Sequence, residues 1–357
     1  MKDIVVLLTR VGSFVSVSYI NTLKTVTERK IRIVGVDSND QNAGSKIVDI
    51  FYKIGEFNKN PSKYCEEILE IVEKEKVNVI LPTDEEESVI LRRNEEKFKE
   101  KGVVLSCPTL EVLEKFNSKS AFYEGLKNKG LPYPHFFVVE DFLSLEFAAR
   151  KLGYPQKEII IKPIKGVAER GFRILSEKVD RLDFLYNKKP AENLYLSLED
   201  LKRIIREKKI PKTIVSEFLG GKREYSVDTL SKEGKLIISI PKFRIKTVLG
   251  ASSIGEVSLD KDILELTKKI IEKLNLNSNI NIQFKENDEG LLVPYEANLR
   301  IAGTISLTTA SGANLIYFGI KQALGEEIPI VEIKNKSKIY RYLGDYFPKI
   351  DNRGGLN

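Results

Sequence analysis

The stretch PYEANLRIAGT, residues 294–304, carries polar side chains at every second position. Glu296, Asn298 and Arg300 alternate with aromatic or apolar residues. Because successive side chains of a strand point to opposite faces, we expect these three to share one face and Tyr295 to face the core. Carboxylate and amide oxygens suit Mg²⁺, and a guanidinium can stabilise charge in phosphoryl transfer. The pattern alone permits a buried row of salt bridges equally well.

Two lysines stand where they could meet phosphate groups. Lys162 ends the β-branched run EIII and precedes a loop containing Gly166 and Gly171, after which FRIL resumes a strand pattern. A hairpin loop with free backbone amides can close over phosphates, although plain hairpins have the same composition. Ser118 is a candidate N-cap that puts Lys119 in the first turn of a helix, where a cation opposes the helix dipole. An exposed surface lysine is the alternative for Lys119.

The segment EFLGGKRE, residues 217–224, combines the groups that a nucleotide needs. It offers an apolar pair, a glycine turn with accessible backbone, and two carboxylates. The residues concerned are Glu217, Phe218, Leu219 and Glu224. For this segment alone, a β-hairpin with two solvated glutamates is the simpler interpretation.

No residue has the setting of a covalent nucleophile. The sole histidine, His135, precedes a predicted strand and is interpreted as structural. Cys65 and Cys107 have neither metal nor redox spacing, which is typical of a protein in the reducing cytoplasm. Any catalysis would therefore rely on positioning and electrostatics.

The elements that must position these groups begin with alternating strands and helices. This order predicts an α/β fold with a parallel sheet. The predicted strands are DIVVLLT, IRIVGVD, VNVILPT and VVLSC, and the predicted helices are VSVSYINTLKTVTER, KYCEEILEIVEKEK and DEEESVILRRNEEKFKEKG. The turn RVGSFVS has one glycine instead of GxGxxG, so dinucleotide binding is disfavoured and Asp37 is interpreted as a strand-end cap.

Composition narrows the partners. The chain has 357 residues with 58 basic and 51 acidic side chains, giving a net charge of +7. Charges of both signs are interleaved along predicted helices, so an anionic small ligand is favoured over nucleic acid. The apolar run IVVLLT is too short for a secretory leader, and no run reaches the roughly 20 residues that span a bilayer. We expect a cytoplasmic protein without a membrane partner.

In order and spacing, Lys119, the loop 162–171, EFLGGKRE, NIQF at 281–284 and EANLR at 296–300 resemble the ATP-grasp superfamily. The similarity is strongest to the branch of the carbamoyl-phosphate synthase large chain. It implies a Rossmann-like N-terminal α/β domain at 1–112 and a two-part ATP-grasp domain at 113–330. A lid at about 135–216 and a C-terminal strand with a mobile tail at 331–357 complete the expected organisation. The segment 303–326 resembles the closing helix-loop-helix of the family.

The resemblance also implies roles for individual residues. For ATP, Lys119 and Lys162 would neutralise phosphates, Gly166 to Gly171 would form the lid loop, Glu217, Phe218 and Leu219 would meet adenine, and Glu224 would bind ribose. The implied magnesium ligands are Gln283, Glu296 and Asn298, with Arg300 near the γ-phosphate and Arg244 facing substrate or phosphate. Leu299 replaces the usual proline, and a glutamine in the first metal position removes one negative charge.

These roles imply an ATP-dependent carboxylate–amine ligase that uses Mg²⁺, with Mn²⁺ possible, and forms an acyl-phosphate. The polar segments 82–87 and 247–256 suggest an amino-acid-like substrate. The alternative is a non-catalytic ATP-binding regulatory protein that retains the fold. Relatives are often homodimers, so a homodimer is a further expectation.

Overall fold

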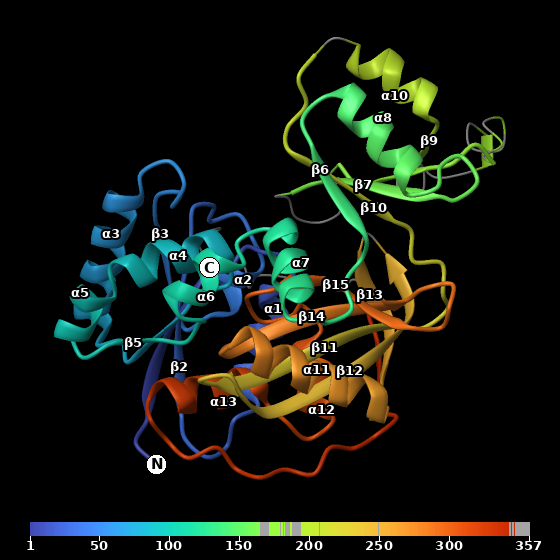
Figure 1. The fold of residues 1–357 in the computed structure, drawn as a ribbon. Helices are drawn as coiled ribbons and strands as arrows, with labels where there is room; N and C mark the ends of the chain where they lie inside the picture. Colours follow the sequence, from blue (N-terminus) through green and yellow to red (C-terminus); the bar gives the residue numbers. More distant parts are fainter. Residues whose placement is uncertain are drawn as a thin grey trace.

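The computed structural model describes residues 1–164, 171–178, 180, 182, 186–187, 194–206, 208–248, 250–342, 344 and 346. Three sheets organise this part of the chain (Figure 1). No helix among these residues is both long and apolar enough to cross a bilayer.

The N-terminal part contains a five-stranded parallel sheet in the order β3-β2-β1-β4-β5, which confirms the predicted α/β fold. Its elements and the helix that follows them are β1 Ile4–Thr9, α1 Ser16–Lys24, β2 Ile31–Asp37, α2 Gly44–Ile47, β3 Ile50–Lys53, α3 Pro61–Glu75, β4 Val79–Leu81, α4 Glu85–Arg93, α5 Glu95–Glu100, β5 Val104–Leu105 and α6 Leu110–Lys115.

Two features of this part differ from the sequence prediction. The edge strand β3 was not predicted, because it is short and only half-buried and so lacks a clear apolar pattern. The helical segment 84–102 is divided at Asn94 into α4 and α5. The Asn94 side chain donates a hydrogen bond to the Ile90 carbonyl at 3.0 Å, a local bond that competes with helix continuation.

A second sheet and two helices project from the remainder of the molecule (Figure 1). The sheet order is β6-β10-β7-β8-β9, and helices α8 and α10 share one apolar core with it. The elements are β6 Phe136–Val139, α8 Phe142–Lys151, β7 Ile159–Pro163, β8 Arg173–Leu175, β9 Tyr195–Leu196, α10 Leu198–Ile205 and β10 Thr213–Glu217. Strands β7 and β8 are antiparallel, as the hairpin prediction requires.

The third sheet, of six strands in the order β15-β14-β11-β12-β13-β16, is antiparallel throughout. Its strands and associated helices are α7 Lys119–Asn128, β11 Glu224–Lys232, β12 Lys235–Val248, β13 Ala251–Val257, α11 Lys261–Leu274, β14 Ser278–Glu286, β15 Leu292–Asn298, α12 Ile305–Ala310, α13 Leu315–Ala323 and β16 Lys338–Tyr340. Strand β16 lies within the segment 331–357, where the sequence predicted a C-terminal strand. The predicted mobile tail 351–357 lies outside the described residues.

One apolar core joins the N-terminal sheet to the six-stranded sheet. Tyr19 and Ile20 of α1 pack in the same cluster as Ile316 of α13 and Leu230 of β11. Helix α1 contacts both α12 and α13. The segment that follows β15 contacts the N-terminal part directly, because the Leu299 amide donates to the Glu85 carboxylate of α4.

Candidate nucleotide and metal site

Helix α7 delivers Lys119 to the polar end of β15. The Ser118 side chain accepts a hydrogen bond from the Ala121 amide at 3.2 Å, which confirms the predicted N-cap. The Lys119 Nζ lies 3.1 Å from Glu296 Oε1. A cation that opposes the helix dipole is therefore directed at a carboxylate of the candidate site.

Lys162 approaches the same carboxylate from β7 and is almost completely buried. Its Nζ donates to the Tyr123 hydroxyl at 2.7 Å, and that hydroxyl donates to the Tyr295 carbonyl at 2.6 Å. Burial lowers the Lys162 pKa to about 8, with Lys119 adding to this effect and Glu296 opposing it. The buried Lys162 ammonium is only partly neutralised by Glu296, so a bound anion would stabilise it.

Glu296 is the carboxylate on which these cations converge. Burial raises its pKa, but the charges of Lys119, Lys162 and Arg300 outweigh burial, so the net pKa is lowered. Glu296 is therefore ionised at neutral pH, as a metal ligand must be.

The expected alternation of β15 fails at Tyr295. The register between β14 and β15 shifts between Gln283 and Phe284, so Gln283 pairs with Glu296 and Phe284 with Pro294. Tyr295 is the extra residue of this bulge, and its hydroxyl donates to Gln283 Oε1 at 2.7 Å. The prediction that Tyr295 faces the core is wrong, because the bulge turns its side chain toward the site.

Arg244 of β12 donates hydrogen bonds to several groups on the same face of the six-stranded sheet as Gln283 and Tyr295. Its Nη1 lies 2.6 Å from Glu224 Oε1, 2.8 Å from the Tyr295 hydroxyl and 3.2 Å from Gln283 Oε1. Its Nη2 donates to the Gly250 carbonyl at 2.6 Å. Arg244 therefore organises the candidate ribose and metal ligands, while a direct contact with substrate or phosphate stays a prediction.

Of the three predicted magnesium ligands, Glu296 and Asn298 fit the role better than Gln283. Glu296 and Asn298 offer a carboxylate and an amide oxygen next to two lysines that would hold phosphates. The Asn298 oxygen accepts one long hydrogen bond from Arg300, at 3.3 Å. The Gln283 oxygen accepts hydrogen bonds from both Tyr295 and Arg244, and each amide oxygen would have to exchange its hydrogen bonds to bind metal. Among the described residues, no group of three or more His, Cys, Asp or Glu side chains could hold a metal, so any magnesium site here needs amide or phosphate oxygens.

The predicted adenine-binding residues lie at the junction of β10 and β11. The Glu217 carboxylate accepts the His135 amide at 3.0 Å and so fixes the start of β6. Leu219 is buried, and the Phe218 ring lies 5.9 Å from the Lys285 ammonium. This arrangement leaves an aromatic and an aliphatic side chain beside the polar face, while adenine binding itself stays a prediction.

Of the two glycines predicted for the lid loop, the structure describes only Gly171. Gly171 adopts a positive φ of 74°, and a Cβ there would lie 2.7 Å from Pro163 Cγ, so this turn needs glycine. Gly166 lies outside the described residues.

Three contributors to the site were missed from sequence. They are Tyr123, Tyr295 and Glu85. Glu85 comes from the N-terminal domain, where its Oε1 accepts the Leu299 amide at 2.9 Å. Burial raises the Glu85 pKa, and the nearby Arg300 opposes that rise. Its only sequence signal was its place in the acidic segment 82–87.

The cysteines match their predicted inert character. Cys65 and Cys107 are both free and buried, and burial raises the pKa of each thiol.

Two family models match the chain. Residues 6–106 match the PylC-like N-terminal domain, and residues 209–343 match the ATP-grasp domain described as belonging to the biosynthetic pathway with the Ter operon. Together with the three-sheet fold, these matches show that the chain is similar to ATP-grasp proteins, in the branch of the carbamoyl phosphate synthase large chain.

Individual relatives agree with this placement. The carbamoyl phosphate synthase large chain of Pseudothermotoga lettingae is 24% identical over 89% of this chain, which spans 28% of that relative's length. The biotin carboxylase domain of Hydrogenobacter thermophilus 2-oxoglutarate carboxylase superposes with a TM-score of 0.66, at 19% identity, over 95% of this chain and 74% of its own. The L-amino acid ligase of Bacillus licheniformis superposes with a TM-score of 0.63, at 13% identity, over 91% and 75%. At these identities the structures establish a shared fold.

Proposed function

We propose that the protein is an ATP- and Mg²⁺-dependent ligase that joins a carboxylate to an amine through an acyl-phosphate. The observation that carries the proposal is the ionised Glu296 surrounded by Lys119, Lys162 and Arg300, which come from three separate segments of the chain. A carboxylate that concentrates cations in this way is suited to sharing a metal with bound phosphates.

In the proposed reaction, the substrate carboxylate oxygen attacks the ATP γ-phosphorus and ADP leaves. The amine then attacks the acyl carbon and phosphate leaves. Lys119 and Lys162 hold the phosphates, Glu296 and Asn298 hold the metal, and Arg300 faces the charge that develops on the transferred group. Mg²⁺ bound there would neutralise phosphate oxygens. Closure of the lid over the site would exclude water from the acyl-phosphate.

Two guanidinium groups support a carboxylate substrate. Among the described residues, neither Arg300 nor Arg341 forms an ion pair; Arg300 donates to the Ile301 carbonyl at 3.0 Å, and Arg341 donates to the Gly303 carbonyl. Burial raises the pKa of Tyr19 to about 12, and the nearby charges of Arg300 and Arg341 oppose this rise, so both cations lie close to one hydroxyl. The charge of Arg300 also acts on Glu296 and Glu85. Two guanidinium groups beside a phosphate site favour an anionic substrate.

The solved relatives support the nucleotide and metal. The Hydrogenobacter domain was crystallised with MgADP and bicarbonate, and the Bacillus enzyme is an L-amino acid ligase. By analogy we infer ATP with Mg²⁺ for this chain, while Mn²⁺ and an amino-acid-like substrate stay predictions.

The first test is a screen of amino acids and small carboxylates with ATP and Mg²⁺, following ADP and phosphate release. Glu296→Gln should lower turnover by about 10²-fold or more, because an uncharged amide cannot replace a metal-binding carboxylate. Glu289→Gln, in the exposed turn before β15, is the matched control and should retain wild-type turnover. Wild-type turnover by Glu296→Gln would refute the metal assignment. ATP binding without turnover on any substrate tested would favour a regulatory protein.

A further inference from the structure

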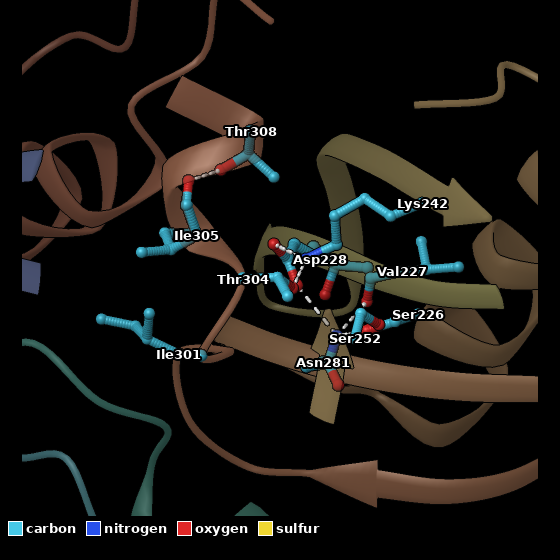
Figure 2. Close-up of polar contacts among 12 residues, drawn as sticks. Ser226, Val227, Asp228, Lys242, Ser252, Asn281, Ile301, Thr304, Ile305 and Thr308 are labelled. Atoms are coloured by element: carbon cyan, nitrogen blue, oxygen red, sulfur yellow. Dashed lines mark hydrogen bonds and ion pairs between the residues drawn. The ribbon is translucent and has the colours of Figure 1, made fainter. Parts of the chain in front are cut away.

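A buried polar cluster continues the face of the six-stranded sheet beyond the candidate metal ligands. Asp228 of β11, Lys242 of β12 and Asn281 of β14 are 3%, 2% and 3% exposed. Figure 2 shows their polar groups converging, with Thr304 approaching from the loop after β15. The Lys242 ammonium donates to Asp228 and, at 2.6 Å, to the Thr304 hydroxyl. Burying an ion pair is costly, so the cluster calls for a function beyond packing.

Asp228 determines which way the Asn281 amide points. The Asn281 Nδ2 donates to Asp228 Oδ1 at 2.8 Å and to Ser226 Oγ at 2.8 Å. An ionised carboxylate can only accept hydrogen bonds, so the amide nitrogen of Asn281 must face it. The Asn281 oxygen is consequently turned to the opposite side. The Lys242 ammonium neutralises the Asp228 carboxylate and holds it in place.

The Asn281 oxygen in turn orients Asn298. Strands β14 and β15 pair Asn281 with Asn298, and the Asn298 Nδ2 donates to Asn281 Oδ1 at 3.5 Å. With its nitrogen directed at Asn281, Asn298 presents its oxygen to Arg300, whose Nη2 lies 3.3 Å away. A flipped Asn298 would turn its NH₂ group toward the Arg300 guanidinium and toward the proposed metal.

We propose that Asp228, Lys242 and Asn281 are positioning residues that fix the amide of Asn298 with its oxygen toward the metal. The inference rests on the proposed function, because it assigns Asn298 a divalent cation. The Asp228 carboxylate, held by Lys242, fixes which way the Asn281 amide points. The Asn281 amide in turn fixes the orientation of the Asn298 amide in the site. Outer partners of metal ligands commonly contribute about 10–100-fold to metal affinity.

The test measures ATP binding by calorimetry across a Mg²⁺ titration and in EDTA. Asn281→Leu removes the acceptor for Asn298 at similar volume. We expect the Mg²⁺ concentration for half-maximal enhancement of ATP binding to rise about 10–100-fold, whereas affinity for metal-free ATP stays within about twofold. Asp228→Asn combined with Lys242→Met removes both charges together and should raise the Mg²⁺ requirement in the same way.

Thr229→Val is the matched control. Thr229 is buried in the same strand one residue from Asp228, and its hydroxyl donates to the Ile280 carbonyl at 3.0 Å and not to the Asn281 side chain. It should leave both affinities unchanged. A wild-type Mg²⁺ requirement in folded Asn281→Leu, or an equal loss of metal-free ATP binding, would overturn the positioning role alone. Wild-type protein whose ATP binding ignores Mg²⁺ would overturn the proposed function and this inference together.

Discussion

Lys162 shows how a single residue can be prepared for a ligand. Its ammonium is buried beside Glu296 and bonded to the Tyr123 hydroxyl, and burial has lowered its pKa to about 8. The side chain is cationic below that pH and neutral above it. The charge that would hold ATP phosphates is therefore sensitive to pH in the mildly alkaline range.

We predict that affinity for metal-free ATP weakens by about tenfold as the pH rises from 7 to 9.5, because Lys162 loses its proton through about pH 8. Calorimetric titrations at several pH values would measure this. Lys162→Arg keeps its charge throughout and should remove the inflection near pH 8. Persistence of that inflection in Lys162→Arg would assign it to another group.

At the scale of elements, the β7–β8 hairpin carries the candidate phosphate-binding lysine in the second sheet, here called the lid sheet because it lies in the predicted lid at about 135–216. Lys162 lies in β7, and Gly171 precedes β8 with a positive φ and with Pro163 close to the position of a Cβ. A substitution at Gly171 can therefore strain the backbone next to Lys162 without removing a charged side chain of the candidate site.

Gly171→Ala should weaken ATP binding several-fold, because a Cβ at positive φ collides with Pro163 and costs on the order of 1–3 kcal/mol locally. Hydrogen exchange should show faster opening in β7 and β8. Gly130→Ala is the control, since its φ is also positive at 61° but its Cβ would meet no atom within 4 Å. Equal effects of the two variants on ATP binding would show that backbone strain in general, and not this hairpin, is responsible.

At the scale of the whole molecule, the three sheets are joined through different apolar cores. The N-terminal and six-stranded sheets share one core around α1 and α13. The sheet of β6 to β10 packs on α8 and α10, and through Ile214 and Phe136 it also joins a core of the six-stranded sheet. We therefore expect the N-terminal and six-stranded sheets to lose structure together, and the part packed on α8 and α10 to open at a lower free energy.

Ile316→Ala should destabilise the shared core by about 2–5 kcal/mol, because it leaves a cavity at a fully buried position. Native-state hydrogen exchange should report reduced protection in β1 and β11 alike. Leu145→Ala, in the lid core, should reduce protection in β7 and β10 only. Loss of protection in β11 without β1 would show that the two sheets unfold independently.

The sequence by itself determined much of the fold and the types of residue in the site. The alternation of apolar runs and helical periods, the Ser118 cap and the Lys162 hairpin are local patterns that depend on neighbours a few residues apart. They were sufficient to predict the parallel sheet and the helix cap, whereas the grouping of Lys119, Lys162 and Glu296 in one site came from the resemblance to the ATP-grasp superfamily.

Tertiary structure alone decided how those residues are connected. The bulge that brings Tyr295 into the site depends on the register of β14 against β15, and the contact of Glu85 with Leu299 depends on docking of the N-terminal domain. The polarity of Asn281 follows from Asp228, which lies on a neighbouring strand far away in sequence. Register and docking are set by the summed packing of distant segments, so no local pattern around these residues could have revealed them.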